Sequence, residues 1–385
     1  MGADRGHCSH ETKVVHGSRG FDPTTGAVSF PIYQTATFRH PGLGSSTGWD
    51  YSRQDNPTRA ELEETIAALE SGSKALAFSS GMAAIAAVLD LFSPGDRILY
   101  SEDLYGGTYR IAETVGASRG LAFALADTRS LVEVEKGWTP ATKALLIESP
   151  SNPMSRISDI AALASFAHSR GALLVVDNTF LTPLLQRPLE LGADIVVHSG
   201  TKFLSGHNDT LAGFAVCGDK GLGEKLASVQ NTTGGVLGPF DSWLVLRGLK
   251  TLALRIARQE SSARALAAWL KERPEVSDVH YAGLEDHPQR ELSLRQASGF
   301  GSMIAFALRD PTDVGRVLET VKIITYAESL GGVESLITYP ILQTHAATPK
   351  ALRDRLGVDE SLLRLSVGIE ALEDLREDLR QALEA

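Results

Sequence analysis

Cysteine is scarce in this chain, since only Cys8 and Cys217 occur among its 385 residues. Two cysteines are too few for a disulfide framework, and a separation of this length does not match the ligand spacing of a zinc site. Both are expected to be bystanders rather than nucleophiles. The composition therefore fits a reducing compartment best.

The chain also lacks a block of basic residues, a long apolar run and an apolar N-terminal segment. Its 37 Lys and Arg against 47 Asp and Glu give a net charge of −10, which argues against nucleic acid as a partner. No apolar run approaches the ~20 residues that cross a bilayer, and the N-terminal segment is too polar for a signal peptide. We therefore expect a soluble cytoplasmic protein without a membrane partner.

Short apolar runs alternate with helix-length segments along most of the chain. This alternation is typical of an α/β fold with a mostly parallel, doubly wound sheet and crossover helices. The length predicts roughly two to three domains. The expected division is an N-terminal arm at 1–50, a large sheet domain at 51–245 and a smaller C-terminal α+β domain at 246–385. Strands are expected at 75–78, 97–100, 121–125, 144–147, 173–176, 195–197, 211–216, 276–281, 302–307 and 362–367.

Helical periodicity marks three further segments. Residues 60–69 are amphipathic, and 240–270 predict one long helix or a pair of helices. Leucines at 372, 375, 379 and 383 form one stripe of a final helix.

Asp177 and Lys202 each follow an apolar run that ends at the same expected edge of the sheet. The run 173–176 stops at Asp177, and the run 195–197 stops shortly before Lys202. Because the carboxyl ends of parallel strands meet at one edge, both side chains are expected in one crevice. A carboxylate that pairs with a ring nitrogen, beside a lysine able to form a Schiff base, is what pyridoxal phosphate needs. Singly, each residue has an ordinary interpretation as a helix cap or a surface lysine.

Three more strand ends carry groups suited to a flat, phosphorylated ligand. Gly81 and Met82 open an alanine-rich helix, so their backbone N–H groups form a phosphate seat. Tyr105 lies on a glycine-flexible loop and can stack on a ring. Asn152 lies between two prolines that stiffen its backbone. The ordinary alternatives are a turn glycine, a packing tyrosine and an Asx-turn asparagine.

Arg364 lies within a strand-like alternation near the C-terminus. Leu363, Leu365 and Val367 share one face, which leaves Arg364 on the other. A guanidinium fork suits an α-carboxylate, whereas the alternative is a surface arginine on an edge strand.

Other catalytic and metal motifs are weak. His198, His207 and Asp209 stand close in sequence, but Lys202 lies between them and no compact helical pair is present, so we expect no metal. The chain has no G-x-G-x-x-G after a strand and no nucleophile elbow.

Seven segments of the chain form a set that is characteristic as a whole. They are Tyr51-Ser52-Arg53 with Asn56-Pro57-Thr58-Arg59, Ser80-Gly81-Met82, Asp103 to Thr108, Ser149-Pro150-Ser151-Asn152-Pro153, Asp177-Asn178-Thr179-Phe180, His198 to Asp209, and Arg364 to Glu370. The set resembles the trans-sulfuration enzymes of cysteine and methionine metabolism, and the motifs occur in family order from about residue 10 to the last helix. The resemblance implies pyridoxal phosphate as cofactor and the aspartate aminotransferase-like fold of type I enzymes.

The resemblance also implies a role for each side chain around the cofactor. Lys202 would form the Schiff base and move protons between substrate carbons, and Asp177 would keep the pyridine nitrogen protonated. Tyr105 would stack on the ring and belongs with Lys202 among the catalytic residues. The phosphate would be held by the amides of Gly81 and Met82 and the hydroxyls of Ser199 and Thr201.

The same resemblance implies a shared active site between subunits. Tyr51 and Arg53 would reach the phosphate bound by the neighbouring subunit, so that a dimer is the minimum unit and a homotetramer, a dimer of dimers, is expected. Arg364 and Asn152 would bind the carboxylate of an amino-acid substrate, with Ser329 supporting that pocket.

Glu328 distinguishes among the activities of the family. Members acting at the γ carbon tend to have a glutamate here, and the segment 337–345 resembles bacterial cystathionine γ-synthase/O-acetylhomoserine thiolyase proteins. We therefore expect γ-replacement on an O-acylhomoserine by cysteine or sulfide, with Glu328 as a catalytic residue. Gly107 disfavours a methionine γ-lyase, which typically has cysteine there, and Asn208 replaces a common serine. The alternatives are a cystathionine γ- or β-lyase, a methionine γ-lyase and a non-catalytic regulator that binds the cofactor.

Overall fold

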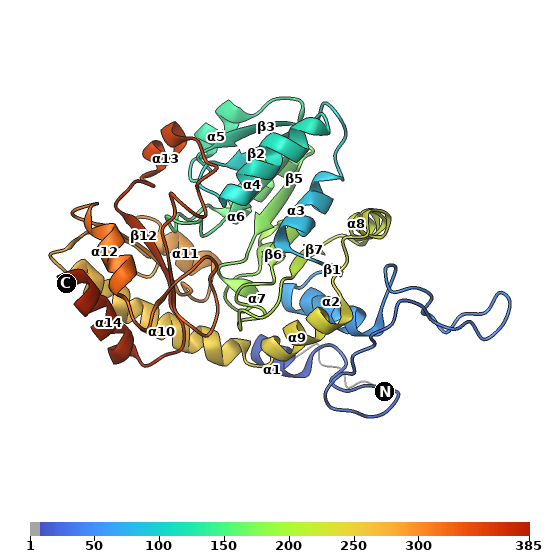
Figure 1. Cartoon of the computed structure of the whole chain (residues 1–385). Coiled ribbons are helices and arrows are strands. Elements are labelled where there is room, and N and C mark those ends of the chain that lie inside the picture. The colour runs from blue at the N-terminus through green and yellow to red at the C-terminus, as the bar shows by residue number, and fades with distance from the viewer. Residues whose placement is uncertain (1–7) are drawn as a thin grey trace.

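A large and a small sheet, each covered by helices, form the body of the molecule (Figure 1). The computed structural model describes residues 8–385. The larger sheet has the strand order β1-β7-β6-β5-β4-β2-β3, and only β7 runs antiparallel to its neighbours. The predicted mostly parallel α/β sheet is therefore confirmed. Its strands are β1 (Lys74–Phe78), β2 (Arg97–Ser101), β3 (Ala122–Ala126), β4 (Thr142–Glu148), β5 (Leu173–Asp177), β6 (Ile195–Ser199) and β7 (Gly213–Cys217).

Helices cover both faces of this sheet, as a doubly wound arrangement requires. One face packs on α2 (Pro57–Glu70), α5 (Leu131–Gly137), α6 (Ile160–His168) and α9 (Pro239–Leu249). The other packs on α3 (Gly81–Leu89), α4 (Gly106–Ile111) with the π-helical turn η1 (Ala112–Gly116), and α8 (Lys220–Thr233). The short elements α7 (Thr182–Leu185) and η2 (Pro188–Leu191) connect β5 to β6.

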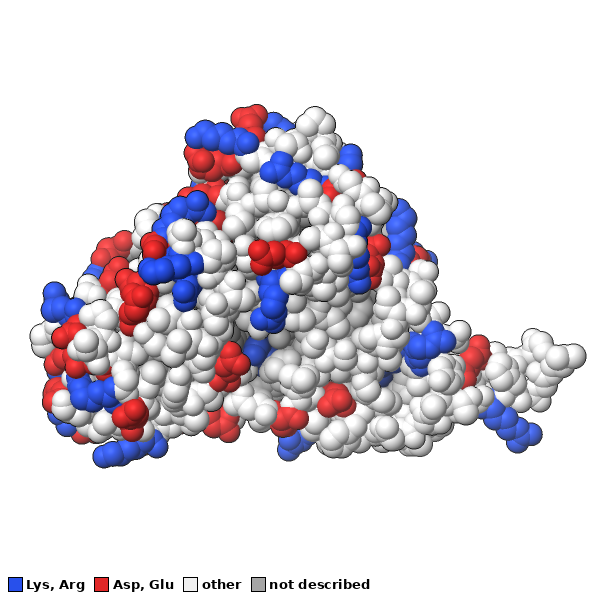
Figure 2. Space-filling view, turned by 45° about the horizontal axis from the view of Figure 1, so that its top comes forward, with Lys and Arg blue, Asp and Glu red and all other residues white. Residues whose placement is uncertain are grey.

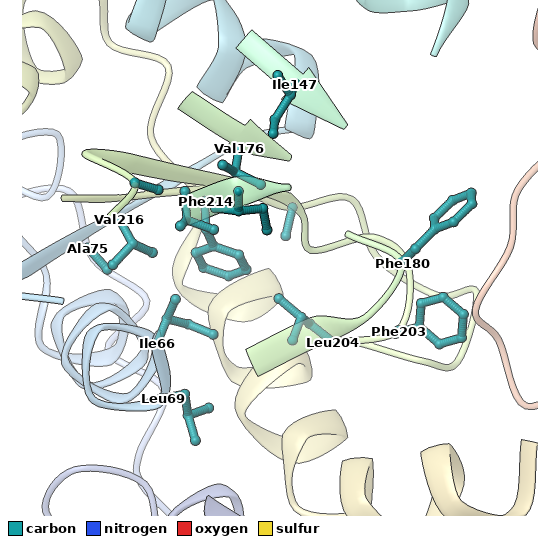
Figure 3. Close-up of a cluster of buried hydrophobic side chains, with 14 of the residues drawn as sticks. Ile66, Leu69, Ala75, Ile147, Val176, Phe180, Phe203, Leu204, Phe214 and Val216 are labelled. Carbon is teal, nitrogen blue, oxygen red and sulfur yellow. The ribbon is translucent and has the colours of Figure 1, made fainter. Parts of the chain in front are cut away.

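The central strands are apolar on both faces because both faces are covered. Figure 3 shows Ile66 and Leu69 of α2 close to Ala75, Phe214 and Val216 of the sheet. Leu174 of β5 and Ile147 of β4 have no exposed surface and belong to the same cluster. This continuous packing holds the carboxyl ends of the strands in fixed relative positions.

The smaller sheet has the order β10-β11-β12-β9-β8, and only β10 and β11 are parallel. A third apolar cluster joins it to three helices, α10, α12 and α14. β12 lies between β11 and β9, so Arg364 is on a central strand. The elements are α10 (Leu252–Lys271), β8 (Val276–His280), α11 (Arg290–Gln296), β9 (Met303–Leu308), α12 (Asp313–Thr320), β10 (Thr325–Tyr326), β11 (Leu336–Thr338), α13 (Lys350–Leu356), β12 (Leu362–Ser366) and α14 (Leu372–Glu384).

The predicted elements agree with the structure in type, with few additions. The segment 240–270 is the pair α9 and α10, broken at Lys250 and Thr251. Sequence analysis missed β10 and β11, which are too short for a periodic signal, and α1 (His10–His16), which buries only Val14. Part of the remaining N-terminal arm projects from the body (Figure 1). The division at residues 50 and 245 stays a prediction.

The surface carries both charge signs. Figure 2 shows Lys and Arg interspersed with Asp and Glu over the face in view. Over residues 8–385, no helix combines the length and the hydropathy that crossing a membrane requires. Within the same range, no three His, Cys, Asp or Glu side chains are grouped so that they could hold a metal ion.

Truncating the buried Leu174 is expected to destabilise the fold strongly. Leu174→Ala removes methyl groups from a side chain with 0% exposure, so it should lower the free energy of unfolding by about 2–5 kcal/mol. The matched control is Leu131→Ala, at a side chain that is 43% exposed, and should cost less than about 1 kcal/mol. Denaturant titration measures both values. Equal midpoints for the two variants would contradict this packing.

Candidate functional site

A cavity of about 210 Å³ lies at the carboxyl ends of the parallel strands, where the sequence predicted a crevice. Polar residues that follow β1, β4, β5 and β6 line it, and β12 of the smaller sheet contributes Arg364. All the site residues predicted from sequence line this cavity, except Tyr51 and Arg53. Those that line it are Gly81, Met82, Tyr105, Asn152, Asp177, Ser199, Thr201, Lys202, Glu328, Ser329 and Arg364.

At one end of the cavity, a ligand can closely approach the backbone at the start of α3. The Ser80 side chain caps α3 by accepting from the Ala83 N–H at 3.1 Å. No described residue accepts from the amides of Gly81 and Met82. A Cβ on Gly81 would lie 3.0 Å from the Cα of Ser199, and one on Gly213 would lie 2.0 Å from the Ser80 carbonyl oxygen. Free amides at a helix N-terminus form an anion site, and only glycine keeps this one open.

Thr179 holds the Asp177 carboxylate in place. The Thr179 amide and hydroxyl both donate to Oδ1 of Asp177, at 2.9 and 2.5 Å, and the hydroxyl also accepts from the Ser199 N–H. Loss of water around the group raises the pKa of the Asp177 carboxyl, whereas the bonds from Thr179 act in the opposite direction. A nearby cation would therefore stabilise the ionised form of this buried carboxyl.

A single side-chain hydrogen bond holds the Lys202 amine near the carboxyl ends of the parallel strands. Its Nζ donates to the Ser329 hydroxyl at 2.8 Å. Burial and the neighbouring Arg364 charge lower the pKa of Lys202 to about 8, from the ordinary 10.5, against an opposing effect of Glu328. The unprotonated, nucleophilic fraction of this amine near neutral pH is therefore much larger than that of an ordinary lysine.

Arg364 is 2% exposed and has only neutral partners. Its Nη1 donates to Asn152 Oδ1 at 3.1 Å, and its Nη2 donates to the Ser329 carbonyl at 3.0 Å and the Thr338 hydroxyl at 3.1 Å. Nε has no partner among the described residues. Burial lowers the pKa of Arg364 to about 10. This buried positive charge without a bonded carboxylate attracts an anion into the cavity.

Ser329 adopts a backbone conformation that is rare for a side chain with a Cβ. Its φ is 109°, in the region that glycine favours. In this conformation its carbonyl accepts from Arg364 while its hydroxyl accepts from Lys202. Strained backbone of this kind clusters at functional sites, since the surrounding contacts must maintain it.

The Tyr105 ring packs directly on the first turn of α4. A Cβ on Gly107 would lie 2.3 Å from Cε1 of the ring, so the glycine makes room for it. The Tyr105 N–H donates to Glu148 Oε2 at 2.8 Å. Burial, followed by the charge of Asp177, raises the pKa of Glu148 well above its usual range. Glu148 and Asp177 are register partners at the ends of β4 and β5.

Sequence reasoning assigned no role to several residues that line or support the cavity, and four of them make contacts that matter for the site. They are Glu148, Thr179, Thr344 and His345. Glu148 and Thr179 follow predicted strands and could have been found from that position. Thr344 and His345 lie in a loop without periodicity, and no local pattern indicates that they meet the cavity.

A second cavity of about 670 Å³ adjoins the first. The two share Thr201, Leu211, Glu328 and Ser329, and Glu328 is exposed where they meet. Among described residues, the lining of the second cavity includes Asp209, Asp241 and Glu328 but no Lys or Arg. The negative charge of this lining favours binding of an ammonium group.

Tyr51 and Arg53 lie outside the cavity of their own chain. The Arg53 guanidinium stacks 5.6 Å from the centre of the Tyr51 ring and donates to Asn231 Oδ1 at 2.8 Å. Tyr51 is 45% exposed. Their predicted contact with a neighbouring subunit's phosphate stays a prediction.

These groups fit pyridoxal phosphate. The free amides of α3, opened by Gly81, match a phosphate. The Asp177 carboxyl with its raised pKa matches a pyridine nitrogen that carries a proton, and Lys202 with its lowered pKa matches a carbonyl carbon.

Comparison with known proteins agrees with this chemistry. Residues 11–384 match the family described as Cys/Met metabolism PLP-dependent enzyme. The chain is 49% identical to cystathionine beta-lyase of Lactococcus lactis over 98% of this chain and 99% of that one. It is 50% identical to cystathionine gamma-synthase/O-acetylhomoserine (thiol)-lyase of Bacillus subtilis over 97% and 96%. The solved cystathionine gamma-lyase of Lactobacillus plantarum, complexed with L-serine, superposes with a TM-score of 0.95 at 44% identity, covering 98% of each chain.

The match spans nearly the whole chain, and the cavity holds the groups that the cofactor requires. The chain belongs to the Cys/Met metabolism family of PLP-dependent enzymes.

Proposed function

We propose that this enzyme catalyses γ-replacement on an O-acylhomoserine, with cysteine as the thiol acceptor and cystathionine as the product. The observation that carries the proposal is the position of Glu328, which lies where the cavity of Lys202 meets a second, acidic cavity. The first cavity would take the acylhomoserine and the second the amino acid that attacks it. Two adjoining cavities suit a reaction that joins two amino acids.

Lys202 acts as the proton carrier in this proposal. Bound pyridoxal phosphate supplies a carbonyl that condenses with amines and a ring that delocalises the electrons left by a departing Cα proton. Lys202 Nζ, with its pKa lowered to about 8, accepts the Cα proton and returns it at the end. The Ser329 hydroxyl keeps Nζ close to its working position. Tyr105 covers the ring, and Asp177 holds the proton on the pyridine nitrogen.

Arg364 and Asn152 bind the substrate carboxylate. Arg364 already donates to Asn152, and its unpartnered Nε and net charge remain for an anion. Fixing the carboxylate there sets the Cα of the substrate relative to Lys202 Nζ, which lies close enough for the two charges to interact.

The γ-replacement step exchanges one bond at Cγ. The Cγ–O bond breaks and the acyl group leaves as a carboxylate, and the sulfur of cysteine then forms the new Cγ–S bond. The thiol proton balances the charge of the departing carboxylate. Glu328 binds the ammonium group of the incoming cysteine, with Asp209 and Asp241 lining the same cavity.

Elimination from cystathionine is the second candidate. Relatives named cystathionine beta-lyase and cystathionine gamma-lyase are 49% and 50% identical to this chain, as close as the γ-synthase. In that reaction the same residues would bind cystathionine, which is cleaved with uptake of one water molecule to a thiol, an oxoacid and ammonia. We further propose that Tyr51 and Arg53 complete the phosphate site of a neighbouring subunit in a homotetramer.

The Lys202 amine is expected to become reactive at a lower pH than exposed lysines. Only the neutral amine attacks an aldehyde, and the neutral fraction rises as the pH passes through the pKa of about 8. Reductive methylation of cofactor-free protein, followed by peptide mapping, should give a half-maximal rate at Lys202 near this pH. Exposed lysines should follow near pH ~10.4. A Lys202 profile that coincides with those lysines would rule out the proposed activation.

Gly213→Ala is expected to weaken cofactor binding. The new Cβ would lie 2.0 Å from the Ser80 carbonyl oxygen, so the turn that presents the Gly81 and Met82 amides must shift. Loss of one to two amide bonds to the phosphate should raise the Kd of pyridoxal phosphate by about 10-fold or more. Gly315→Ala is the control, because nothing lies within 4 Å of its Cβ. Absorbance titration of both apoproteins measures the Kd, and equal values would contradict the proposed phosphate seat.

The substrate panel tests the reaction itself. Holoenzyme is supplied with O-acetyl- or O-succinylhomoserine plus cysteine, or with cystathionine alone, and products are identified by mass spectrometry. Cystathionine formation should exceed cystathionine breakdown in kcat/KM. The opposite order would refute γ-replacement and favour the lyase.

Glu328→Gln should raise the KM for cysteine by about 10-fold, since it removes the charge that faces the ammonium group. Glu319→Gln, on the exposed face of α12, is the control and should match the unmodified enzyme. An unchanged KM for cysteine in Glu328→Gln would remove Glu328 from the proposed acceptor site.

A further inference from the structure

The peptide group between Leu104 and Tyr105 is bonded at both of its ends by side chains from elsewhere in the chain. Its N–H, on Tyr105, donates to Glu148 Oε2 at 2.8 Å. Its carbonyl, on Leu104, accepts from His345 Nε2 at 3.2 Å. The orientation of this peptide constrains φ of Tyr105. Tyr105 is the N-cap of α4, and its carbonyl accepts from the N–H groups of Thr108 and Tyr109.

His345 bonds two loops of the active site at once. The same Nε2 also lies 3.1 Å from the Asn152 carbonyl. Its Nδ1 lies 2.9 Å from the Thr344 hydroxyl. The ring is 1% exposed, and Asn152 is 3% exposed, so water does not replace these contacts.

The partners determine which ring nitrogen carries the proton. Both neighbours of Nε2 are carbonyl oxygens, which only accept, so Nε2 carries the hydrogen and shares it between them. Nδ1 then accepts from Thr344. Burial and the charge of Arg364 lower the pKa of His345 to about 4, so the ring is neutral at physiological pH and has this one donor.

The loop that carries His345 also contacts the Tyr105 loop through its backbone. A Cβ on Gly106 would lie 2.2 Å from the Thr344 carbonyl oxygen. Thr344 itself lines the cavity. Residues 344–345 therefore pack against the segment that presents Tyr105, over a gap of more than 200 residues in sequence.

We propose that His345 is a positioning residue, which holds the Tyr105 ring and the Asn152 amide at a fixed relative position through its Nε2–H. The inference rests on the proposed roles of Tyr105 over the cofactor and Asn152 at the substrate carboxylate. In this role His345 links the binding of the substrate carboxylate by Asn152 to the position of the Tyr105 ring over the cofactor. It is independent of which amino acid the enzyme prefers.

Two substitutions separate this role from simple space filling. His345→Gln places an amide N–H near the position of Nε2 and can still donate to the carbonyls of Leu104 and Asn152. His345→Asn reaches only the position of Nδ1 and leaves both carbonyls without their donor. His168→Gln, at an exposed histidine paired with Asp194, is the control for loss of a histidine.

The holoenzymes are compared with whichever substrate the unmodified enzyme turns over. Three quantities are measured: KM and kcat separately, the circular dichroism band of the bound cofactor, and the thermal unfolding midpoint. We expect His345→Gln to keep kcat/KM within about 3-fold. His345→Asn should lose about 10- to 100-fold, with a raised KM and an altered cofactor band, because small misplacements at a reacting centre are costly.

A purely structural histidine would lower the unfolding midpoint in both variants and leave KM and the cofactor band unchanged. Equal kinetics and equal bands for His345→Gln and His345→Asn overturn the inference. If His345→Asn does not fold, a 10-fold loss of kcat/KM in His345→Gln overturns it, since that variant retains the donor. Asn152→Ala in the same assay tests the proposed carboxylate role separately, through the KM of the amino-acid substrate.

Discussion

The site depends on one buried charged group, the guanidinium of Arg364. It extends from the central strand of the smaller sheet and donates to Asn152, which follows a strand of the larger one. Desolvating a cation is costly, and here the hydrogen bonds that offset the cost come only from neutral oxygens, while Glu148 and Glu328 favour the charge without a direct contact. Among the described residues, no carboxylate forms an ion pair with this charge. In the proposed reaction an amino-acid carboxylate would complete the pairing, so that substrate binding would offset the desolvation cost of Arg364.

The ionisable groups around this charge are held away from their ordinary states. Burial raises the pKa values of Asp177 and Glu148 and lowers the pKa of Lys202. For two of these groups the proposed partner lies outside the chain: a ring cation for Asp177 and a carbonyl carbon for Lys202. Glu148 instead accepts from the Tyr105 N–H. The rigid packing of the parallel strands maintains these shifts, because the groups cannot move apart to regain water.

Much of this site could be predicted before the fold was known. Asp177, Gly81 and Asn152 each follow an apolar run, and parallel strands place such positions along one edge. Arg364 could be assigned to a strand face but not to the cavity, because alternation does not distinguish a central strand from an edge strand. Glu148 was overlooked although it ends a strand, since its importance arises from Asp177 beside it and the Tyr105 amide in front of it.

The sequence by itself determined the α/β class, the family and most of the proposed site residues that line the cavity, because these follow from local periodicity and from short motifs at strand ends. Only the tertiary structure decided which distant groups touch. His345 contacts the loops of Leu104 and Asn152 across more than 190 residues, and Ser329, which has a positive φ, contacts both Lys202 and Arg364. Such contacts depend on how loops of two sheets pack together, and no local pattern in the chain encodes that packing.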